Sequence, residues 1–244
     1  MKIVIPMAGS GKSFKEAGYT FPKPLIDIDN KSMIQVVVEN LNLSGDYIFL
    51  VKKEQYDKFS LKDLLNLFKP NCTVIPVDRD LGGAANTVLL AKEFINNDEE
   101  LIIANSDQWI NWNPQHFLSF LRGKNADGGI VTFISTHPRW SFVKINESGV
   151  VTEVAEKKPI SNMATAGIYY FKEGKFFVEG AEAMIEKNIK THNEFYIVPS
   201  FNEIITKHPN IYSYPIAEMH SLGTPEDLQK FILNIHSTVK ATES

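Results

Sequence analysis

The 244-residue sequence has a single cysteine, little excess charge of either sign and no apolar run long enough to cross a membrane. The lone Cys72 excludes an internal disulfide and a zinc site built on paired cysteines, and it fits a reducing cytoplasm. The 25 Lys and Arg against 29 Asp and Glu give a net charge of −4, which excludes a general attraction to nucleic acid or acidic membranes. We therefore expect a cytoplasmic protein with no nucleic-acid or membrane partner, in which any phosphate site is local.

Short apolar, β-branched runs alternate with amphipathic stretches, which is typical of βα units around a largely parallel sheet. The predicted strands are Lys2–Met7, Tyr47–Lys52, Cys72–Val77, Leu101–Ala104, Gly129–Ser135, Ser141–Ile145, Val150–Ala155 and Ala164–Phe171. The predicted helices are Met33–Leu43, Glu54–Phe68, Ala84–Ile95, Gly174–Asn188, Tyr196–Lys207 and Pro225–His236. We expect one α/β domain over residues 1–244, with a single doubly wound, mostly parallel (mixed) sheet and helices on both faces.

The longest predicted connection runs for about two dozen residues between the first strand and the first helix, so it is either functional or disordered. It begins with small residues that let backbone amides approach a phosphate, namely Met7, Ala8, Gly9, Ser10 and Gly11. Lys12, Lys15 and Lys23 add cations, and Lys23 stands between two prolines that stiffen its backbone. A polyphosphate is the natural ligand, and a glycine turn with solvated lysines is the alternative.

Two other phosphate motifs fit this loop poorly. Gly11-Lys12-Ser13 matches the end of a P-loop, but Pro6 occupies the position of its first glycine. Gly18, Pro22 and Pro24 further predict that no helix follows the motif. The third glycine of the dinucleotide fingerprint is also absent. An ATPase, a kinase or a dinucleotide enzyme is therefore disfavoured.

The first strand, the Met-Ala-Gly-Ser-Gly-Lys loop, the Phe21-Pro22-Lys23-Pro24-Leu25 segment and the helix start at Met33 resemble the signature of the sugar-phosphate nucleotidylyltransferase superfamily. The resemblance extends to Asp107, to Glu156-Lys157 and to Leu222–Leu228, so it covers nearly the whole chain. It implies a Rossmann-like nucleotidyltransferase fold, a nucleotide-binding half at about 1–110 and an acceptor-binding half at about 111–244, as well as a homodimer. It also implies transfer of a nucleoside monophosphate from a triphosphate to a phosphorylated small-molecule acceptor, with release of pyrophosphate.

The resemblance also implies roles for single residues. The catalytic set is Lys12, Lys23 and Asp107, and Asp107 follows the buried strand Leu101–Ala104, where a carboxylate suits Mg²⁺. The nucleotide-binding set is Met7, Ala8, Gly9, Ser10, Gly11, Gly82, Gly83, Asn86, Thr87 and Ser106. The acceptor-binding set is Glu156, Lys157, Lys158, Gly167 and Glu194. Without the resemblance, a turn aspartate, a plain helix start and a solvated charge run explain the same residues.

Two positions depart from the family pattern. The arginine that usually contacts the triphosphate is Ser13, and the second metal-binding aspartate is Ser221. A serine offers neither the bidentate fork of an arginine nor any charge. A slow enzyme, or a nucleotide-binding regulatory protein without turnover, is therefore an open alternative.

The Ile-Pro-Met-Ala-Gly form of the loop, followed by Ala17–Pro24, is similar to enzymes of capsule and surface-polysaccharide biosynthesis. Within that group the sequence resembles cytidylyltransferases, which implies CTP as the nucleotide and glutamine phosphate as the acceptor. A sugar 1-phosphate with UTP, dTTP or GTP is the alternative within the same class. The isolated pairs Asp27/Asp29 and Asp78/Asp80 match a metal-binding Asp-x-Asp, but turn aspartates explain them better.

Overall fold

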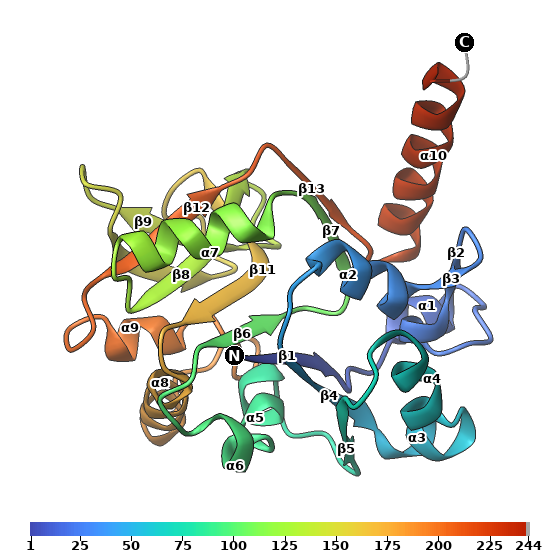
Figure 1. The fold of residues 1–244 in the computed structure, drawn as a ribbon, viewed down its shortest axis with the longest axis horizontal. Coiled ribbons are helices and arrows are strands. Elements are labelled where there is room, and N and C mark those ends of the chain that lie inside the picture. The colour runs from blue at the N-terminus through green and yellow to red at the C-terminus, as the bar shows by residue number, and fades with distance from the viewer. Residues whose placement is uncertain (243–244) are drawn as a thin grey trace.

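A nine-stranded mixed sheet forms the centre of the computed structural model, and helices lie on both of its faces (Figure 1). The structure describes the backbone of residues 1–242 and the side chains of residues 1–235. The strands of this sheet are β1 Lys2–Met7, β4 Asp46–Lys52, β5 Thr73–Val77, β6 Leu101–Ala104, β8 Gly128–Ile134, β9 Ser141–Ile145, β10 Val151–Glu156, β11 Met163–Phe171 and β12 Ile211–Pro215. Their order is β10-β9-β11-β6-β1-β4-β5, with β8 pairing β11 and β12. The expected mixed sheet is confirmed.

The apolar runs of the first half form the parallel part of the sheet. β1 pairs in parallel with β4 on one side and β6 on the other, and β4 pairs in parallel with β5. Side chains alternate between faces along a strand, so Ile3 and Ile5 join one core cluster while Val4 joins the other. Because both faces of β1 are apolar, helices must cover both.

Helices cover the two faces in two groups. α2 Met33–Leu41, α4 Leu61–Phe68, α7 Pro114–Gly123 and the start of α10 Pro225–Thr242 contribute to the first core cluster. α5 Ala84–Leu89, α6 Lys92–Ile95, α8 Gly174–Glu186 and α9 Ser200–Ile204 contribute to the second. α3 Lys53–Lys58 precedes α4, and α10 projects away from the body of the molecule (Figure 1).

Several helices differ from their predicted ranges, and α10 extends past its predicted end at His236 to Thr242. The helix predicted over Glu54–Phe68 breaks at Ser60, whose left-handed φ of 47° separates α3 from α4. Ala84–Ile95 is divided into α5 and α6. The helix predicted over Tyr196–Lys207 is limited to α9, since Pro199 disfavours helical geometry in the residue before it. α2 ends at Leu41 because Asn42 adopts a left-handed φ of 44°.

The long first connection contains four short elements: α1 Lys12–Glu16, the 3₁₀ turn η1 Lys23–Leu25, and the hairpin strands β2 Asp27–Ile28 and β3 Lys31–Ser32. The expectation that no helix follows Gly11-Lys12-Ser13 is therefore wrong. The five residues of α1 contain neither Gly nor Pro, and the buried ring of Phe14 packs into the core. The turn then ends near Gly18, whose φ is 84°.

Three further strands were not predicted from the sequence. β12 Ile211–Pro215 pairs in parallel with β8, and its buried residues alternate along the strand. β7 Gln108–Asn111 and β13 Glu218–Ser221 form a separate antiparallel pair in which Ser221 stands opposite Gln108. This pairing returns the chain after β12 to the carboxyl end of β6.

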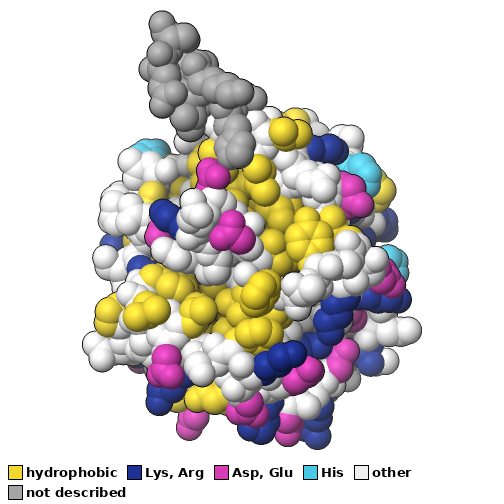
Figure 2. Space-filling view, turned by 90° about the vertical axis from the view of Figure 1, so that its right-hand side faces the viewer, with side chains coloured by type: hydrophobic (Ala, Val, Ile, Leu, Met, Phe, Trp, Pro, Cys, Tyr) yellow, Lys and Arg dark blue, Asp and Glu magenta, His cyan; other side chains and the backbone are white. Residues whose placement is uncertain are grey.

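Figure 2 shows apolar side chains gathered on the face of the molecule that carries the first connection, α3 and α4, with charged side chains among them. Phe21 and Leu67 are 58% and 85% exposed. Within residues 1–242, no helix combines the length and the apolar character needed to span a membrane.

Candidate active site

A pocket of about 200 Å³ lies beyond the carboxyl end of β6, the edge where open α/β sheets bind ligands. Its wall comes from the β6–β7 connection, the β8–β9 loop, the end of β10, the middle of β11 and the segment before α9. Four of the residues predicted from the sequence line it: Asp107, Glu156, Lys157 and Gly167. Ser221, at the end of β13, also lines it.

The first loop reaches the end of β6 through one ion pair. Lys23 Nζ lies 2.5 Å from Asp107 Oδ2, and the two side chains are 21% and 29% exposed. Pro24 in η1 is buried, which anchors the backbone beside Lys23. The Lys23 ammonium also lies 6.0 Å from the centroid of the Phe14 ring. A lysine and an aspartate from different elements therefore meet at one point.

The oxygens of Asp107 and Ser221 face the same small space. Leu222 N donates to the Asp107 carbonyl at 2.8 Å, and Gly223 N donates to Ser221 Oγ at 3.1 Å. A Cβ added to Gly223 would lie 3.2 Å from both Asp107 Oδ2 and Ser221 Oγ. A side chain at this position would crowd both oxygens.

This donor set can hold Mg²⁺, which needs one or two protein oxygens and takes its other ligands from phosphates and water. Asp107 and Ser221 supply a carboxylate and a hydroxyl, and the Asp107 oxygen that faces Ser221, Oδ2, is also the one that Lys23 contacts. Within the part of the chain whose side chains are described, no three His, Cys, Asp or Glu residues cluster as a metal cage. A site completed by substrate phosphates fits these residues better than a site made of protein ligands alone.

Glu156 and Lys157 form the opposite wall. Ser141 Oγ donates a hydrogen bond to Glu156 Oε2, and burial raises the pKa of the Glu156 carboxyl. Lys157 Nζ donates to the hydroxyl of Tyr196 at 2.5 Å and lies 4.5 Å from the centroid of its ring. Burial and the nearby Glu194 raise the pKa of Tyr196. The wall presents one partly buried carboxyl and one ammonium held by an aromatic ring.

Gly167 lets β11 approach the chain that leaves β6. Its φ is 74°, and the register of β11 shifts between Thr165 and Tyr169. A Cβ there would lie 2.3 Å from Gln108 Oε1 and 2.5 Å from Asn105 Nδ2. Asn105 N and Gln108 Nε2 both donate to the Gly167 carbonyl, at 2.9 and 3.2 Å. This close approach requires glycine.

The Gly82-Gly83 loop packs on the backbone of Phe195. Phe195 N donates to the Gly82 carbonyl at 2.8 Å, and Ala85 N donates to the Phe195 carbonyl at 3.0 Å. Gly83 has a φ of 129°, and a Cβ there would lie 2.3 Å from Phe195 O. The loop is thereby joined to the segment containing Glu194, so the first half of the chain meets the second half here.

Asn86 and Thr87 hydrogen-bond to their own loop. Asn86 Nδ2 donates to the Leu81 carbonyl at 2.7 Å, and Thr87 Oγ1 donates to the Gly83 carbonyl at 3.0 Å. These bonds use one donor of the Asn86 amide and the hydroxyl proton of Thr87. The two side chains stabilise the start of α5.

Several predicted residues lie outside the pocket lining. The Lys12 side chain is 79% exposed, and its ammonium lies 3.7 Å from Glu16 Oε1 one helical turn away. Met7 is buried in the core at the end of β1. The others lie in the turn before α1, after β6 or in exposed segments: Ala8, Gly9, Ser10, Gly11, Ser106, Lys158 and Glu194.

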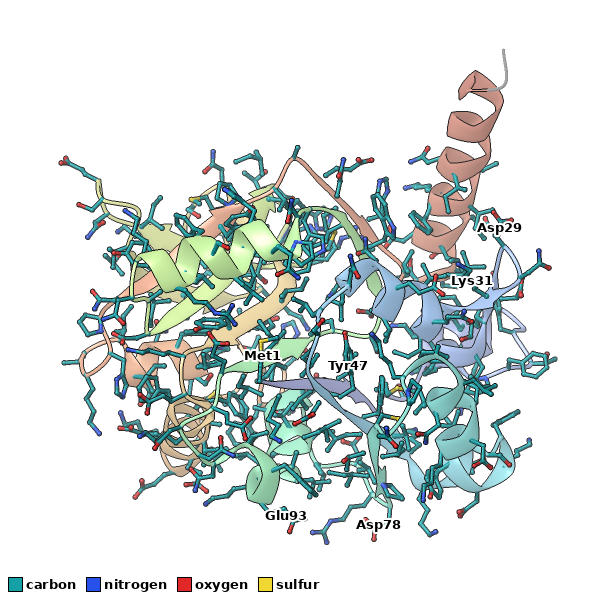
Figure 3. The ribbon with its side chains drawn as sticks, viewed as in Figure 1. Met1, Asp29, Lys31, Tyr47, Asp78 and Glu93 are labelled. Atoms are coloured by element: carbon teal, nitrogen blue, oxygen red, sulfur yellow. The ribbon has the colours of Figure 1, made fainter. Side chains whose placement is uncertain are left out.

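The two Asp-x-Asp pairs do not come together. Asp29 lies in the turn between β2 and β3, whereas Asp78 follows β5 at the lower edge of the view in Figure 3. Asp80 Oδ1 accepts a hydrogen bond from Gly82 N at 2.9 Å, as a turn aspartate does.

Sequence reasoning missed Arg139 and Trp140, which line the pocket from the β8–β9 loop. They stand between two predicted strands and belong to no spacing pattern. Their place in the site depends on long-range strand pairing, which leaves no local signal.

The nucleotidyl transferase family model matches residues 2–236. GlmU, a bifunctional protein of Methanocaldococcus jannaschii, is 26% identical over 179 residues, which cover 72% of this chain and 41% of that protein. Mannose-1-phosphate guanylyltransferase 1 of Arabidopsis thaliana is 28% identical over 177 residues, 69% of this chain and 49% of that protein. The chain spans about half or less of the length of these curated relatives.

Solved structures extend the likeness over the whole fold. A nucleoside-diphosphate-sugar pyrophosphorylase from Vibrio cholerae RC9 superposes with a TM-score of 0.81 at 26% identity, covering 94% of this chain and 99% of the other. The inositol-1-phosphate CTP transferase of T. maritima shares the fold, with a TM-score of 0.77 at 13% identity over 98% and 96% of the two chains. This chain belongs to the nucleotidyl transferase family.

Proposed function

We propose that this protein transfers a nucleoside monophosphate from a nucleoside triphosphate to a phosphorylated small-molecule acceptor and releases pyrophosphate. The observation that carries the proposal is the contact between Lys23 and Asp107. It puts a positioned cation and a carboxylate beside the pocket that Glu156 and Lys157 line. Membership of the nucleotidyl transferase family supports the proposal.

In the proposed reaction, an oxygen of the acceptor phosphate forms a bond to the α-phosphorus. The bond between the α-phosphorus and the oxygen that bridges to the β-phosphate breaks in line, and that oxygen leaves with pyrophosphate. An acceptor that is a phosphate monoester has its second pKa at about 6, so it is mostly dianionic at neutral pH and needs no general base. The protein must supply alignment and charge.

Lys23 is assigned to the α-phosphate or the acceptor phosphate, because its stem is anchored by the prolines on either side. Lys12 and the amides of the turn from Gly9 to Gly11 are assigned to the β- and γ-phosphates, and Lys12 must turn away from Glu16 to reach them. When bound, Mg²⁺ neutralises charge on the triphosphate. Asp107 and Ser221 are the residues that would hold it.

We propose CTP as the nucleotide and glutamine phosphate as the acceptor, in capsule or surface-polysaccharide biosynthesis. The form of the first loop is the reason for this choice. A sugar 1-phosphate with UTP, dTTP or GTP is the second candidate, and the names of relatives such as the guanylyltransferase of Arabidopsis thaliana favour it. The half of the chain from about residue 111 to residue 244 is proposed to bind the acceptor.

The test combines Mg²⁺, each ribonucleoside triphosphate or dTTP, and a panel containing glutamine phosphate and sugar 1-phosphates. Pyrophosphate release is measured for every pair. Pyrophosphate release with CTP and glutamine phosphate alone is the expected result. Release with a sugar 1-phosphate would show that the acceptor is a sugar 1-phosphate and not glutamine phosphate. Tight nucleotide binding without release from any pair would favour a regulatory protein, and Ser13→Arg would then show whether the missing arginine explains the loss.

A further inference from the structure

Arg139 is an arginine of the pocket wall whose charge the proposed reaction does not use. The sequence contains only three arginines, at positions 79, 122 and 139. The Arg139 side chain is 44% exposed. Its Nη1 donates to both carboxylate oxygens of Asp227, at 2.9 and 3.3 Å. One nitrogen of the guanidinium therefore makes both of these bonds.

Arg122, in the same molecule, binds its carboxylate through two nitrogens and not through one. Its Nε and Nη2 donate to the two oxygens of Glu100, at 2.8 and 2.5 Å, which is the bidentate fork that binds a carboxylate. On Arg139, this Nε and Nη2 edge has no hydrogen bond to any residue whose side chain is described. Arg139 lines the pocket, and this edge of its guanidinium has no such partner.

The guanidinium of Arg139 is held in place from two sides. It lies 4.2 Å from the centroid of the Trp140 ring, a cation–π contact. Asp227 is only 12% exposed, and its backbone N–H donates to Thr224 Oγ1 at the start of α10. Arg139 N also donates to His137 Nδ1 at 3.2 Å, which fixes the loop. A held donor loses little entropy when it binds a ligand.

A second cation of the pocket is tied to the same loop. Lys157 N donates to the Trp140 carbonyl at 3.0 Å, so the backbones that carry Arg139 and Lys157 are joined. One pocket of about 200 Å³ thus contains an ammonium and an unused guanidinium fork. If the acceptor phosphate binds at Lys157, the fork of Arg139 remains for a second anionic group of the acceptor.

We infer that Arg139 determines acceptor specificity by binding a carboxylate of the acceptor. The acceptor is then a small molecule that carries both a phosphate and a carboxylate. This inference rests on the proposed function, because it concerns the acceptor of that same site. It selects against sugar 1-phosphates, which carry no carboxylate.

The test measures direct binding by calorimetry with two matched pairs of phosphate monoesters. Phosphoserine has a carboxylate where phosphoethanolamine has a hydrogen, and 3-phosphoglycerate has a carboxylate where glycerol 3-phosphate has a hydroxymethyl group. The wild-type protein is expected to bind the carboxylate member of at least one pair about tenfold more tightly, the factor expected from a charge-assisted bond. Arg139→Gln is expected to bind both members equally. Equal affinities in the wild-type protein, or a preference that survives Arg139→Gln, would overturn the inference.

Two further variants show whether Arg139 binds the acceptor carboxylate or only stabilises the position of α10. Arg122→Gln removes the same group from a surface ion pair and should leave the preference intact. If Arg139 only fastened α10 through Asp227, Asp227→Asn and Arg139→Gln would weaken both members of a pair equally, and this result would also overturn the inference.

Calorimetry measures binding without turnover. Failure of the proposed reaction can therefore be distinguished from failure of the proposed carboxylate site. Absence of pyrophosphate release together with a carboxylate preference that Arg139→Gln removes would reject the reaction and keep the subsite. Pyrophosphate release without any carboxylate preference would keep the reaction and reject the subsite.

Discussion

The Lys23 ammonium lies 2.5 Å from Asp107 Oδ2, although the two residues are 84 positions apart in the sequence. Lys23 stands in the turn after α1, and Asp107 follows β6. The pair therefore fixes the first loop against the carboxyl end of the parallel strands. We propose that the phosphates react beside this pair of charges.

Lys23→Met should lower turnover by on the order of a hundredfold or more, because it removes a positioned cation from the developing negative charge. Pyrophosphate release at saturating substrate measures the loss. Lys31→Met is the matched control, since Lys31 forms a similar ion pair with Glu39, at 2.6 Å, but on the surface. A Lys23→Met protein as active as the control would refute the assigned role.

Ser221→Asp should lower the Mg²⁺ concentration for half-maximal activity by about tenfold, because a second carboxylate would face the space beside Asp107. A Mg²⁺ titration of pyrophosphate release measures the change. Ser148→Asp, in the exposed turn between β9 and β10, adds the same charge away from the pocket. If both variants lowered the Mg²⁺ concentration for half-maximal activity equally, the added negative charge would explain the change and the position of residue 221 would not.

Gly83→Ala should lower the free energy of unfolding by roughly 1–3 kcal/mol, the usual cost of a strained backbone position. The new Cβ would collide with the backbone of Phe195, and the φ of 129° disfavours any side chain. Urea unfolding measures the loss. Gly123→Ala is the control, because a Cβ there meets nothing within 4 Å. Equal stability of the two variants would contradict the described packing.

Glu156→Gln should be more stable than the wild-type protein at neutral pH. Burial raises the pKa of Glu156 above its ordinary 4.5, so the folded protein keeps this proton to higher pH than the unfolded chain does. The wild-type free energy of unfolding therefore falls as pH rises through the interval above 4.5, and the variant lacks this loss. Ser141 can still donate its hydrogen bond, because the side-chain amide that the substitution introduces keeps one acceptor oxygen.

Thermal unfolding of both proteins from pH 4 to pH 8 checks this. The Tm difference should grow with pH to about 2–4 °C, which corresponds to ~1 kcal/mol in a chain of this length. Glu153→Gln, at an exposed position of the same strand, should show no such trend. A variant that becomes less stable than the wild-type protein at pH 8 would reverse the assigned sign.

The parallel half of the fold could be predicted from local sequence. β1 and β6 have their predicted bounds, and β4 and β5 differ by one residue at one end. Long apolar runs identify such strands because both faces are buried. β7 and β13 have no such run, and they are strands because they pair with each other although they lie far apart in the sequence. The helices also break near Ser60 and Leu90, where the sequence has no Gly or Pro to indicate a break.

Part of the candidate site was predicted from the resemblance to the family, and the place of Asp107 after a buried strand agreed with it. Asp107 follows β6, Glu156 ends β10 and Lys157 comes next, and all three line one pocket. The position of Lys12 was not predictable, since its direction depends on the local α1 turn and the pairing with Glu16. Arg139 was missed because its place at the pocket depends on long-range contacts, which include the pairing of the strands and the ion pair with Asp227 of α10.

The central claim is attack of an acceptor phosphate at the α-phosphorus of the nucleotide. The most direct measurement is ³¹P NMR of the wild-type protein with Mg²⁺, CTP and glutamine phosphate. The account predicts that pyrophosphate and a new phosphoanhydride product, with the cytidine phosphate joined to the acceptor, accumulate in equal amounts. Release of orthophosphate with CDP, or an unchanged spectrum while CTP is bound, would contradict it.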